Sequence, residues 1–523
     1  EKVEQEFQQL VEKHNQQPRL LFDLSSWMVA RGKLDEAKKV LNQVVELEEN
    51  TDVGLKAKTV LAKIAFENRN LEESGRIVDD ILSANSNYDD AKILQARLLL
   101  VKEKYDEAIM LLNKILWSKA DSEEAMLLLG QAYLIKGDQK QADKQFSNAL
   151  AVNAASKQAF DYVYEKALNS KDVKYIKEIL DNAIRLRPDN IDFLEKMAKV
   201  HMLENKWDDA VVVVEKIKGI PNPLANDLAI FLRGEIYQGR GEFAKAITEY
   251  KTLLEKFPQN SDALGNMARC YEKLNKRSEM VAFLTGILAK NSNNLPAGIL
   301  LSDLYLINKE YAKANTLLTD LIKNNPKVPQ LYIAMASLKS AQNDNKAAIQ
   351  VYQDGLRQSP GHIKLSLSLA SLLEDQGEYD AALSAYETIL AKNPQLDVAK
   401  NNLATLLIEH YTDQDKLNKA IEIAEKFKDS DQPYYRDTYA WTLIKTGKTN
   451  EGLDILNNII INSPDVPVFR YHLAVANYKN GNATMAMAEL REALELAAKK
   501  GGFSDKKAAE TLLQEIMDKR KGG

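Results

Sequence analysis

The feature that most constrains the fold of this chain is a 34-residue period, marked at one phase by a small or apolar residue. A proline follows many of these markers by twelve residues, as at Pro258, Pro326, Pro360 and Pro394. Such a period is typical of chains in which one supersecondary unit stacks on copies of itself. The markers are Ala108, Ala142, Ile176 and Ala210, followed by Ala246, Met280, Ala314, Ala348 and Ala382.

Each period contains two amphipathic helices and a tight turn. Small residues at Gly130 and Ala142 allow two helix backbones to approach closely, while Phe146 fills the remaining space. A single hairpin of this size cannot bury its apolar stripe, so we expect the hairpins to stack into one elongated core. Between residues 122 and 155, the apolar residues keep helical spacing on either side of Gly137, at Met126, Leu129, Tyr133, Ala142, Phe146 and Ala149.

These residues resemble the tetratricopeptide repeat. The resemblance implies an all-α, right-handed superhelical solenoid of about fourteen helix-turn-helix repeats. It also implies a concave surface that is lined by the first helix of each repeat and binds protein or peptide partners. The pattern is clearest in Leu232, Gly234, Tyr237, Gly241, Phe243, Ala246, Tyr250 and Pro258, and again in Leu369, Ala370, Gly377, Tyr379, Ala382, Tyr386 and Pro394.

The chain is predicted to have three segments: an N-terminal capping helix in residues 1–17, the repeat array in residues 18–500, and a C-terminal capping helix with a frayed tail in residues 501–523. The first cap is predicted from the stripe Val3, Phe7, Leu10 and Val11. In the last, we expect Ser504 to cap a helix that turns Ala508, Leu512, Leu513 and Ile516 inward.

Three departures from the period should alter the array locally. The first two repeats are 37 residues apart, which predicts a longer connection around Glu49–Val53. The segment Gly219–Pro223 adds two residues and two prolines, which predicts a hinge or a change of pitch. An insertion at His410–Lys416 predicts a loop that projects from the array.

Composition excludes some partners and leaves the compartment open. The net charge is −5, with both signs interspersed, which argues against nucleic acid. No apolar run is long enough to span a membrane. Cys270 is the only cysteine, so neither an internal disulfide nor a thiolate metal cage can form. One cysteine is compatible with the cytoplasm and with the periplasm.

Motifs that could carry catalysis have simpler explanations, and we predict no catalytic, cofactor or metal site. The segment Gly239–Ala244 matches a dinucleotide loop, but a helix and not a strand precedes it. Asp413 and Asp415 lack the remaining ligands of a calcium loop. Five histidines lie in separate repeats without a second ligand one turn away, namely His14, His201, His362, His410 and His472.

A candidate binding surface is predicted on the first helices near the end of the array. The resemblance places Trp441 on the concave lining, where an exposed tryptophan would anchor a partner. The alternative is that the aromatic rings cover the C-terminal helix. The predicted residues are Asn401, Thr405, Tyr434, Asp437, Trp441, Tyr471 and Tyr478.

Family binding signatures narrow the predicted function. No three consecutive repeats supply the Lys, Asn and Arg set of a carboxylate clamp, and only Asn266 and Asn402 occupy the phase of an asparagine ladder. Residues 437–443 and 469–476 are similar to the closing repeats of large bacterial tetratricopeptide proteins of exopolysaccharide assembly, including the PEP-CTERM system. The predicted function is a non-catalytic scaffold, with the periplasm favoured over the cytoplasm. The alternatives are a polysaccharide-binding module that uses Trp441, and the regulatory arm of a larger enzyme.

Overall fold

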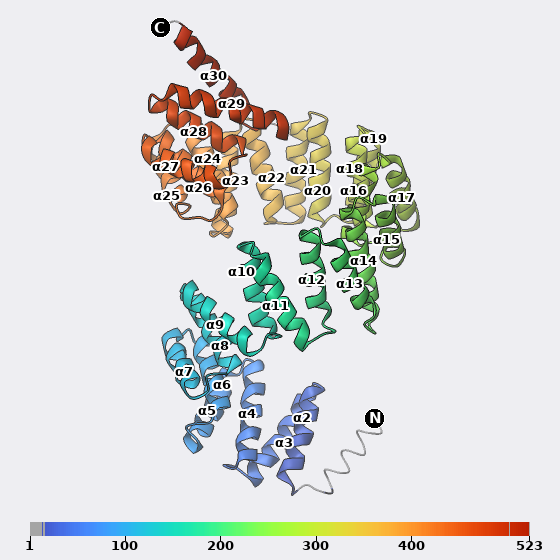
Figure 1. Ribbon diagram of the computed structural model, residues 1–523, viewed down its shortest axis with the longest axis vertical. Coiled ribbons are helices and arrows are strands. Elements are labelled where there is room, and N and C mark those ends of the chain that lie inside the picture. The colour runs from blue at the N-terminus through green and yellow to red at the C-terminus, as the bar shows by residue number, and fades with distance from the viewer. Residues whose placement is uncertain (1–12, 14–15, 502, 522–523) are drawn as a thin grey trace. The chain divides into compact units, whose positions relative to one another are not determined.

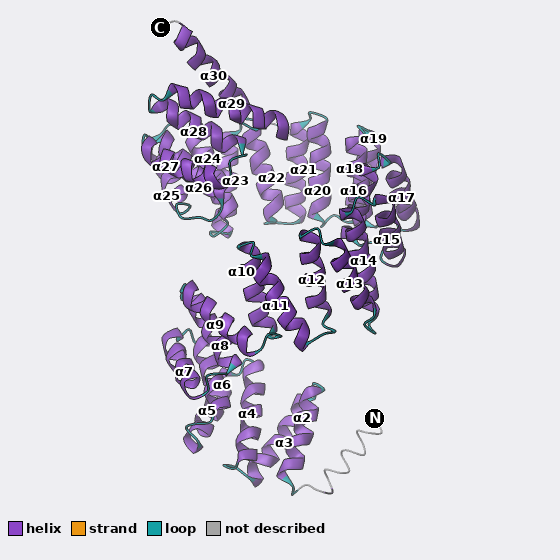
Figure 2. Cartoon of the chain, in the orientation of Figure 1, coloured by secondary structure: helices purple, strands orange, loops and turns teal. Residues whose placement is uncertain are grey.

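The computed structural model describes residue 13, residues 16–501 and residues 503–521. These residues form helices and short connections, with no strand among them (Figure 2). The helices run in chain order from α2 to α30 (Figure 1). The chain divides into two compact units, one ending at Glu249 and the other beginning at Tyr250, so the boundary lies within α15 (Phe243–Lys256). The predicted N-terminal stripe of Val3, Phe7, Leu10 and Val11 lies outside the described residues.

In the N-terminal unit, even-numbered helices are the first members of hairpins and odd-numbered helices are the second members. The bounds are α2 (Pro18–Ala30), α3 (Leu34–Leu47), α4 (Asp52–Glu67), α5 (Leu71–Ala84), α6 (Asp89–Val101), α7 (Tyr105–Ser118), α8 (Glu123–Ile135), α9 (Gln139–Val152), α10 (Lys157–Asn169), α11 (Val173–Leu186), α12 (Ile191–Leu203), α13 (Trp207–Lys218) and α14 (Pro223–Gly239).

The C-terminal unit continues the same alternation and ends with an additional helix. Its helices after α15 are α16 (Ser261–Lys273), α17 (Arg277–Lys290), α18 (Leu295–Ile307), α19 (Tyr311–Asn324), α20 (Pro329–Ala341), α21 (Asn345–Gln358), α22 (Ile363–Asp375), α23 (Tyr379–Lys392), α24 (Asp397–His410), α25 (Gln414–Glu425), α26 (Pro433–Lys445), α27 (Thr449–Asn462), α28 (Pro467–Lys479), α29 (Ala483–Lys500) and α30 (Lys506–Lys521).

The two kinds of helix differ in what they contact. Many first helices pack against the first helix of the next hairpin as well as against their own partner, as α24 does with α26 and α26 with α28. Second helices pack mainly against the helices that precede and follow them in the chain. Within each unit, we call the surface made by the first helices the first-helix face.

One residue in the left-handed region closes the turn in most hairpins. Its N–H and that of the next residue bond back to the end of the first helix, as when the N–H of Lys33 donates to the carbonyl of Met28 at 3.0 Å. Glycine suits this conformation, but polar and charged residues also occupy it. In the C-terminal unit the positions recur every 34 residues, at Asn275, Lys309, Asn343 and Gly377, and this confirms the predicted register.

The packing predicted around Gly130 is confirmed. Ala142 is fully buried and Phe146 is 2% exposed. A Cβ atom added at Gly130 would lie 2.9 Å from Cε2 of Phe146, which is closer than carbon atoms pack. The ring of Phe146 therefore occupies the space that the missing side chain leaves between α8 and α9.

At two of the three departures, the additional residues lengthen a first helix and not a connection. The expected longer connection at Glu49–Val53 is wrong, because α4 has 16 residues and begins at Asp52. In the same way, α14 has 17 residues and begins at Pro223, the last residue of the proline segment. A helix satisfies its own backbone hydrogen bonds, and three or four additional residues make about one turn, so the buried face is preserved.

The expected projecting loop at His410–Lys416 is also wrong. Only residues 411–413 separate α24 from α25. The hydroxyl of Tyr411 donates to Oδ1 of Asp380 at 2.8 Å, and Asp413 caps α25 by accepting from the N–H of Lys416 at 3.0 Å. The additional length appears after α25, in residues 426–432.

The C-terminal helix packs on the last hairpin in a register that differs from the predicted one. It begins at Lys506, and the carbonyl of Asp505, not Ser504, accepts the first helical hydrogen bond, from Ala509. Ala509 and Ile516 are buried in a cluster with residues of α28 and α29, and Leu512 and Leu513 are half-buried against it. Ala508 is exposed, and its neighbour Ala509 takes the inward position.

Candidate binding surface on the first helices

The seven predicted site residues lie on three consecutive first helices. Asn401 and Thr405 belong to α24, Tyr434, Asp437 and Trp441 to α26, and Tyr471 and Tyr478 to α28. Since α26 contacts both α24 and α28, the fold brings these residues to one part of the first-helix face. Their exposure differs widely, from the buried Asp437 and Trp441 to the exposed Tyr434.

Trp441 is buried and is not the exposed anchor that the sequence suggested. Its side chain is 4% exposed, and its ring stacks on that of His472 with centroids 3.9 Å apart. Both carboxylate oxygens of Asp437 lie 3.0 Å from Nδ1 of His472. Because residues on the next first helix cover the indole, Trp441 supports the packing between α26 and α28.

Two charged residues that the sequence analysis did not single out complete this cluster. The indole N–H of Trp441 donates to Oε1 of Glu409, and Nζ of Lys445 donates to Oε2 of the same carboxylate at 3.0 Å. Nζ of Lys445 also lies 4.8 Å from the centroid of the Trp441 ring. Glu409 thus joins α24 to α26. Glu409 follows the apolar Ile408, and nothing in the neighbouring sequence indicated that it would join the two helices.

Two of the predicted aromatic residues contact the C-terminal segment, as the alternative interpretation expects. The hydroxyl of Tyr478 donates to Oε1 of Glu515 at 3.1 Å, and Nζ of Lys519 donates to the same hydroxyl at 2.9 Å. The ring of Tyr471 packs near that of Phe503, with centroids 6.1 Å apart. Burial raises the pKa of Tyr471 to about 12.

Three predicted residues remain accessible to a partner. Tyr434 is 58% exposed, and its ring is supported by Phe469, with centroids 4.9 Å apart. Asn401 and Thr405 are half-buried. Oδ1 of Asn401 is buried without a hydrogen-bond partner among the described residues. The binding role of these three side chains remains a prediction.

Comparison with known families identifies the repeating unit. Models of the tetratricopeptide repeat match residues 123–156, 231–279 and 340–401. These residues fall in hairpins of both units, and the same helix, turn and helix succession continues between them. The chain is a tetratricopeptide-repeat protein. Repeats of this kind support a role as a protein-interaction scaffold.

This tetratricopeptide-repeat protein is similar to a curated relative described as the BBSome complex member BBS4 homolog of Drosophila melanogaster. The two are 25% identical over 155 residues, which is 29% of this chain and 32% of that protein. The match thus spans about a third of the relative's own length.

Solved structures similar to the tetratricopeptide-repeat protein cover most of its length. They include yeast Tom70, which is 14% identical in sequence and has a TM-score of 0.39. That match covers 89% of this chain and 96% of the Tom70 chain. A chain of the Cut9-Hcn1 hetero-tetramer of the APC/C is 14% identical, with a TM-score of 0.37, and the match covers 94% of this chain and 95% of that chain. A chain of Naa15/Naa10 bound to HypK-THB is 12% identical, with a TM-score of 0.35, and the match covers 89% of this chain and 97% of that chain.

The motifs weighed for catalysis take structural positions in the tetratricopeptide-repeat protein. Gly241 is the left-handed turn residue between α14 and α15, with φ of 78°. Cys270 is fully buried, and burial raises the pKa of its thiol to about 11. The described residues contain no group of three or more His, Cys, Asp or Glu side chains placed to hold a metal ion. Within the same part of the chain, no helix has the length and apolar character to cross a membrane.

A half-buried carboxyl group on α22 adds a titratable site to the first helices. Burial, together with the negative charges of Asp375 and Glu409, raises the pKa of Glu374 to about 7, against a hydrogen bond from Tyr386 that lowers it. The Tyr386 hydroxyl lies 3.3 Å from one carboxyl oxygen, and Nε2 of His410 lies 3.9 Å from the other. Burial lowers the pKa of His410, so no strong positive charge offsets the cost of ionising Glu374 at neutral pH.

The raised pKa of Glu374 predicts a pH-dependent stability. An unfolded glutamate titrates near pH ~4.3, so between that pH and about 7 the folded protein holds a proton that the unfolded chain has lost. Stability should therefore fall as pH rises through this window. Glu374→Gln stays neutral and should be more stable than the wild type at pH 8, on the order of 2 kcal/mol, with little difference at pH 4.5.

Hydrogen exchange over α22 and α23, measured by mass spectrometry for both proteins at several pH values between 4.5 and 8, tests this effect, and the quantity compared is the difference between the two opening free energies. The pH dependence that other carboxylates contribute to stability cancels in that difference, because both proteins contain them. A difference that stays constant with pH would contradict the assignment to Glu374.

Proposed function

We propose that this tetratricopeptide-repeat protein is a scaffold that holds segments of partner proteins against its first-helix face. The observation that carries the proposal is that the neighbouring first helices α24 and α28 hold accessible side chains of α26 in place. Tyr434 is supported from below by Phe469, and Lys445 is held by Glu409. Side chains that are ordered before binding lose little conformational entropy when a partner arrives.

The similarity to a protein named as a member of the BBSome complex supports a role as one subunit of a larger assembly. The match covers only part of each protein, so it supports the kind of role and not the identity of the partners. A stack of hairpins also suits such a role, since each hairpin adds surface to the array.

Site-directed photocrosslinking in the native host tests the proposal. A benzophenone amino acid would replace Tyr434 on the first helix α26, and in a second strain Ile461 on the second helix α27. Both side chains are exposed, at 58% and 75%, and both belong to the C-terminal unit. We expect discrete protein adducts from position 434 and none from position 461. Adducts from both positions alike, or from position 461 alone, would contradict the proposal.

A second measurement uses the partner identified by mass spectrometry. Purified partner should bind Tyr434→Ala at least about tenfold more weakly than the wild type, because an exposed and supported aromatic ring is a typical interface anchor. Ile461→Ala serves as the matched control and should bind with unchanged affinity. Equal affinities for wild type and Tyr434→Ala would remove this part of the first-helix face from the binding site.

A finer role in bacterial exopolysaccharide assembly or export is a second candidate. It is supported by the similarity of residues 437–443 and 469–476 to the closing repeats of proteins in those systems. The exposed ring of Tyr434 could stack on a sugar, whereas the buried Trp441 could not. Retardation of the protein in gels containing exopolysaccharide from the host should be lost in Tyr434→Ala. Unchanged retardation in that variant would remove the glycan interpretation.

A further inference from the structure

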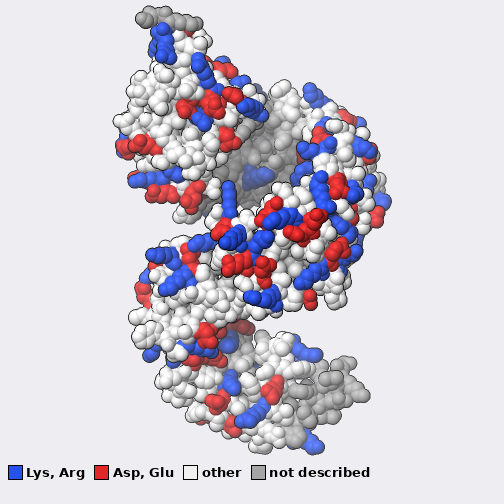
Figure 3. Space-filling view, in the orientation of Figure 1, with Lys and Arg blue, Asp and Glu red and all other residues white. Residues whose placement is uncertain are grey.

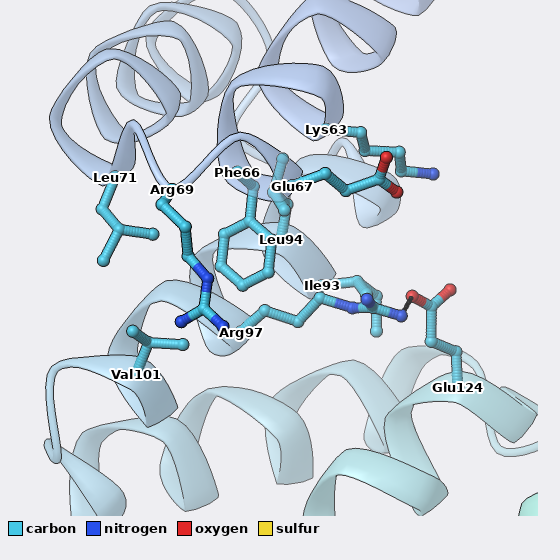
Figure 4. A pocket seen from close by; sticks show the side chains of 10 residues that line it. All are labelled: Lys63, Phe66, Glu67, Arg69, Leu71, Ile93, Leu94, Arg97, Val101 and Glu124. Atoms are coloured by element: carbon cyan, nitrogen blue, oxygen red, sulfur yellow. Dashed lines mark hydrogen bonds and ion pairs between the residues drawn. The ribbon is translucent and has the colours of Figure 1, made fainter. Parts of the chain in front are cut away.

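The N-terminal unit contains a cavity on its first-helix face, between α4, α6 and the start of α8 (Figure 4). Its volume is about 450 Å³, within the ~300–1,000 Å³ of typical ligand pockets. We call it the α4–α6 cavity. Its lining combines apolar and charged side chains, namely Lys63, Phe66, Glu67, Arg69, Leu71, Ile93, Leu94, Arg97, Val101 and Glu124.

The apolar part of the α4–α6 cavity is incompletely covered. Leu94 is buried at 2% exposure and forms part of the core, while Phe66 and Leu71 are half-buried against the same cluster. Val101, the last residue of α6, is 47% exposed. An apolar side chain from a partner would remove the exposed surface of these residues from water.

The charged part of the cavity has unused hydrogen-bonding capacity. Neither Lys63 nor Arg69 has an ion-pair partner among the described residues. Arg97 donates one guanidinium N–H to Glu124 at 2.7 Å, which leaves other donors of its five free. In Figure 4, the Glu67 carboxylate lies on the side of Lys63, away from the guanidinium of Arg69. The environment of Arg69 is therefore cationic and apolar.

The equivalent position of the first helix is closed in one hairpin of the C-terminal unit, at Trp441. Lys63, Arg97 and Trp441 each lie six residues before the left-handed turn residue of their hairpin, at Arg69, Glu103 and Gly447. Trp441 satisfies its indole N–H on Glu409 and packs on His472. Lys63 and Arg97 lie beside a cavity instead. This position is therefore filled by internal contacts at Trp441 and borders a cavity at Lys63 and Arg97.

We infer that the α4–α6 cavity binds a segment of a protein partner that carries a carboxylate side chain next to a large apolar side chain. The carboxylate would pair with the guanidinium of Arg69, which presents two parallel donors, with Lys63 as a second cation. The apolar side chain would cover Phe66, Leu71 and Val101. This inference rests on the proposed scaffold function and names the chemistry of one partner segment.

Fluorescence anisotropy with the full-length chain and three labelled peptides tests the inference. The peptides have equal length and differ at two central residues, which are Glu-Phe, Lys-Phe or Glu-Ser. We expect the Glu-Phe peptide to bind at least about tenfold more tightly than either of the others, because it alone satisfies both parts of the cavity. Equal affinities for Glu-Phe and Lys-Phe, or no binding of Glu-Phe at millimolar concentration, would overturn the inference.

Charge reversal at Arg69 locates the binding. Arg69→Glu should weaken binding of the Glu-Phe peptide at least about tenfold. Arg69→Lys should retain part of the affinity, because it keeps the charge, and should lose the rest, because a lysine cannot pair with a carboxylate through two parallel donors. Lys309→Glu is the matched control, since Lys309 occupies the equivalent turn in the C-terminal unit with φ of 60°, against 63° for Arg69. It changes the same charge in the same backbone conformation and should leave binding unchanged.

The outcomes separate this inference from the proposed function. Crosslinks at position 434 together with peptide binding that ignores Arg69→Glu would overturn the inference and leave the scaffold function intact. If inorganic phosphate competes with the Glu-Phe peptide as well as an excess of unlabelled Glu-Phe peptide does, the cavity is a simple anion site and the proposed peptide chemistry is wrong. Circular dichroism melting of each variant verifies that it folds as the wild type does.

Discussion

Phe146→Ala is expected to destabilise the hairpins around α9 by about 3 to 5 kcal/mol, the usual cost of truncating a buried phenylalanine. The ring is 2% exposed, lies over Gly130 and stacks on Tyr162 with centroids 4.1 Å apart. Both neighbours are held by their own helices, so the surroundings cannot collapse fully into the cavity. Hydrogen exchange measured by mass spectrometry is the appropriate probe, because a repeat array opens locally and its unfolding is not a single transition.

Trp117→Ala is the matched control for this experiment. Trp117 lies on the neighbouring second helix α7 and is 95% exposed, so removing its ring should change the opening free energy by less than about 0.5 kcal/mol. A loss of less than about 1 kcal/mol for Phe146→Ala would show that the interface between α8 and α9 is not packed as described.

Asp437→Ala is expected to cost about 3 kcal/mol, measured in the same way over α26 and α28. The substitution removes the only acceptor seen for Nδ1 of His472 among the described residues and leaves this polar atom buried beneath Trp441. Both side chains are largely buried, with exposures of 7% for Asp437 and 9% for His472. Water can therefore replace the lost carboxylate only if the packing of α26 against α28 opens.

A double variant isolates the interaction from the loss of packing. Asp437→Ala combined with His472→Leu removes both polar partners and should lose less stability than the sum of the two single variants. Asp415→Ala, at an exposed position in the first turn of α25, controls for the removal of a negative charge. If the single and double variants prove additive, the Asp437 to His472 contact does not stabilise the last hairpins.

Much of the fold could be predicted from the 34-residue period. Markers such as Ala142 and Ala382 are fully buried, and Gly377 closes its turn in the left-handed conformation, as the repeat pattern requires. These features depend on contacts within one hairpin, whose residues lie close together in the chain. The helix phase also placed Asn401, Tyr434 and Tyr471 on first helices.

The prediction failed where the answer depends on how one hairpin packs against the next. The position of Trp441 on α26 indicates that it points away from its own hairpin partner, but its exposure depends on His472, which lies 31 residues later, and on Glu409, which lies 32 residues earlier. The sequence also suggested a longer connection at Glu49–Val53, yet α4 absorbs the inserted residues as additional helix.

The chain alone was sufficient to derive the repeating hairpin, the position of its turns and the residues buried inside each hairpin, because helical spacing and turn chemistry act over a few residues. It could not reveal that the phase of Trp441 is filled while that of Lys63 and Arg97 borders a cavity. That difference arises from side chains on separate helices, which meet only after the hairpins have stacked, and no spacing within one repeat records which neighbour will be there.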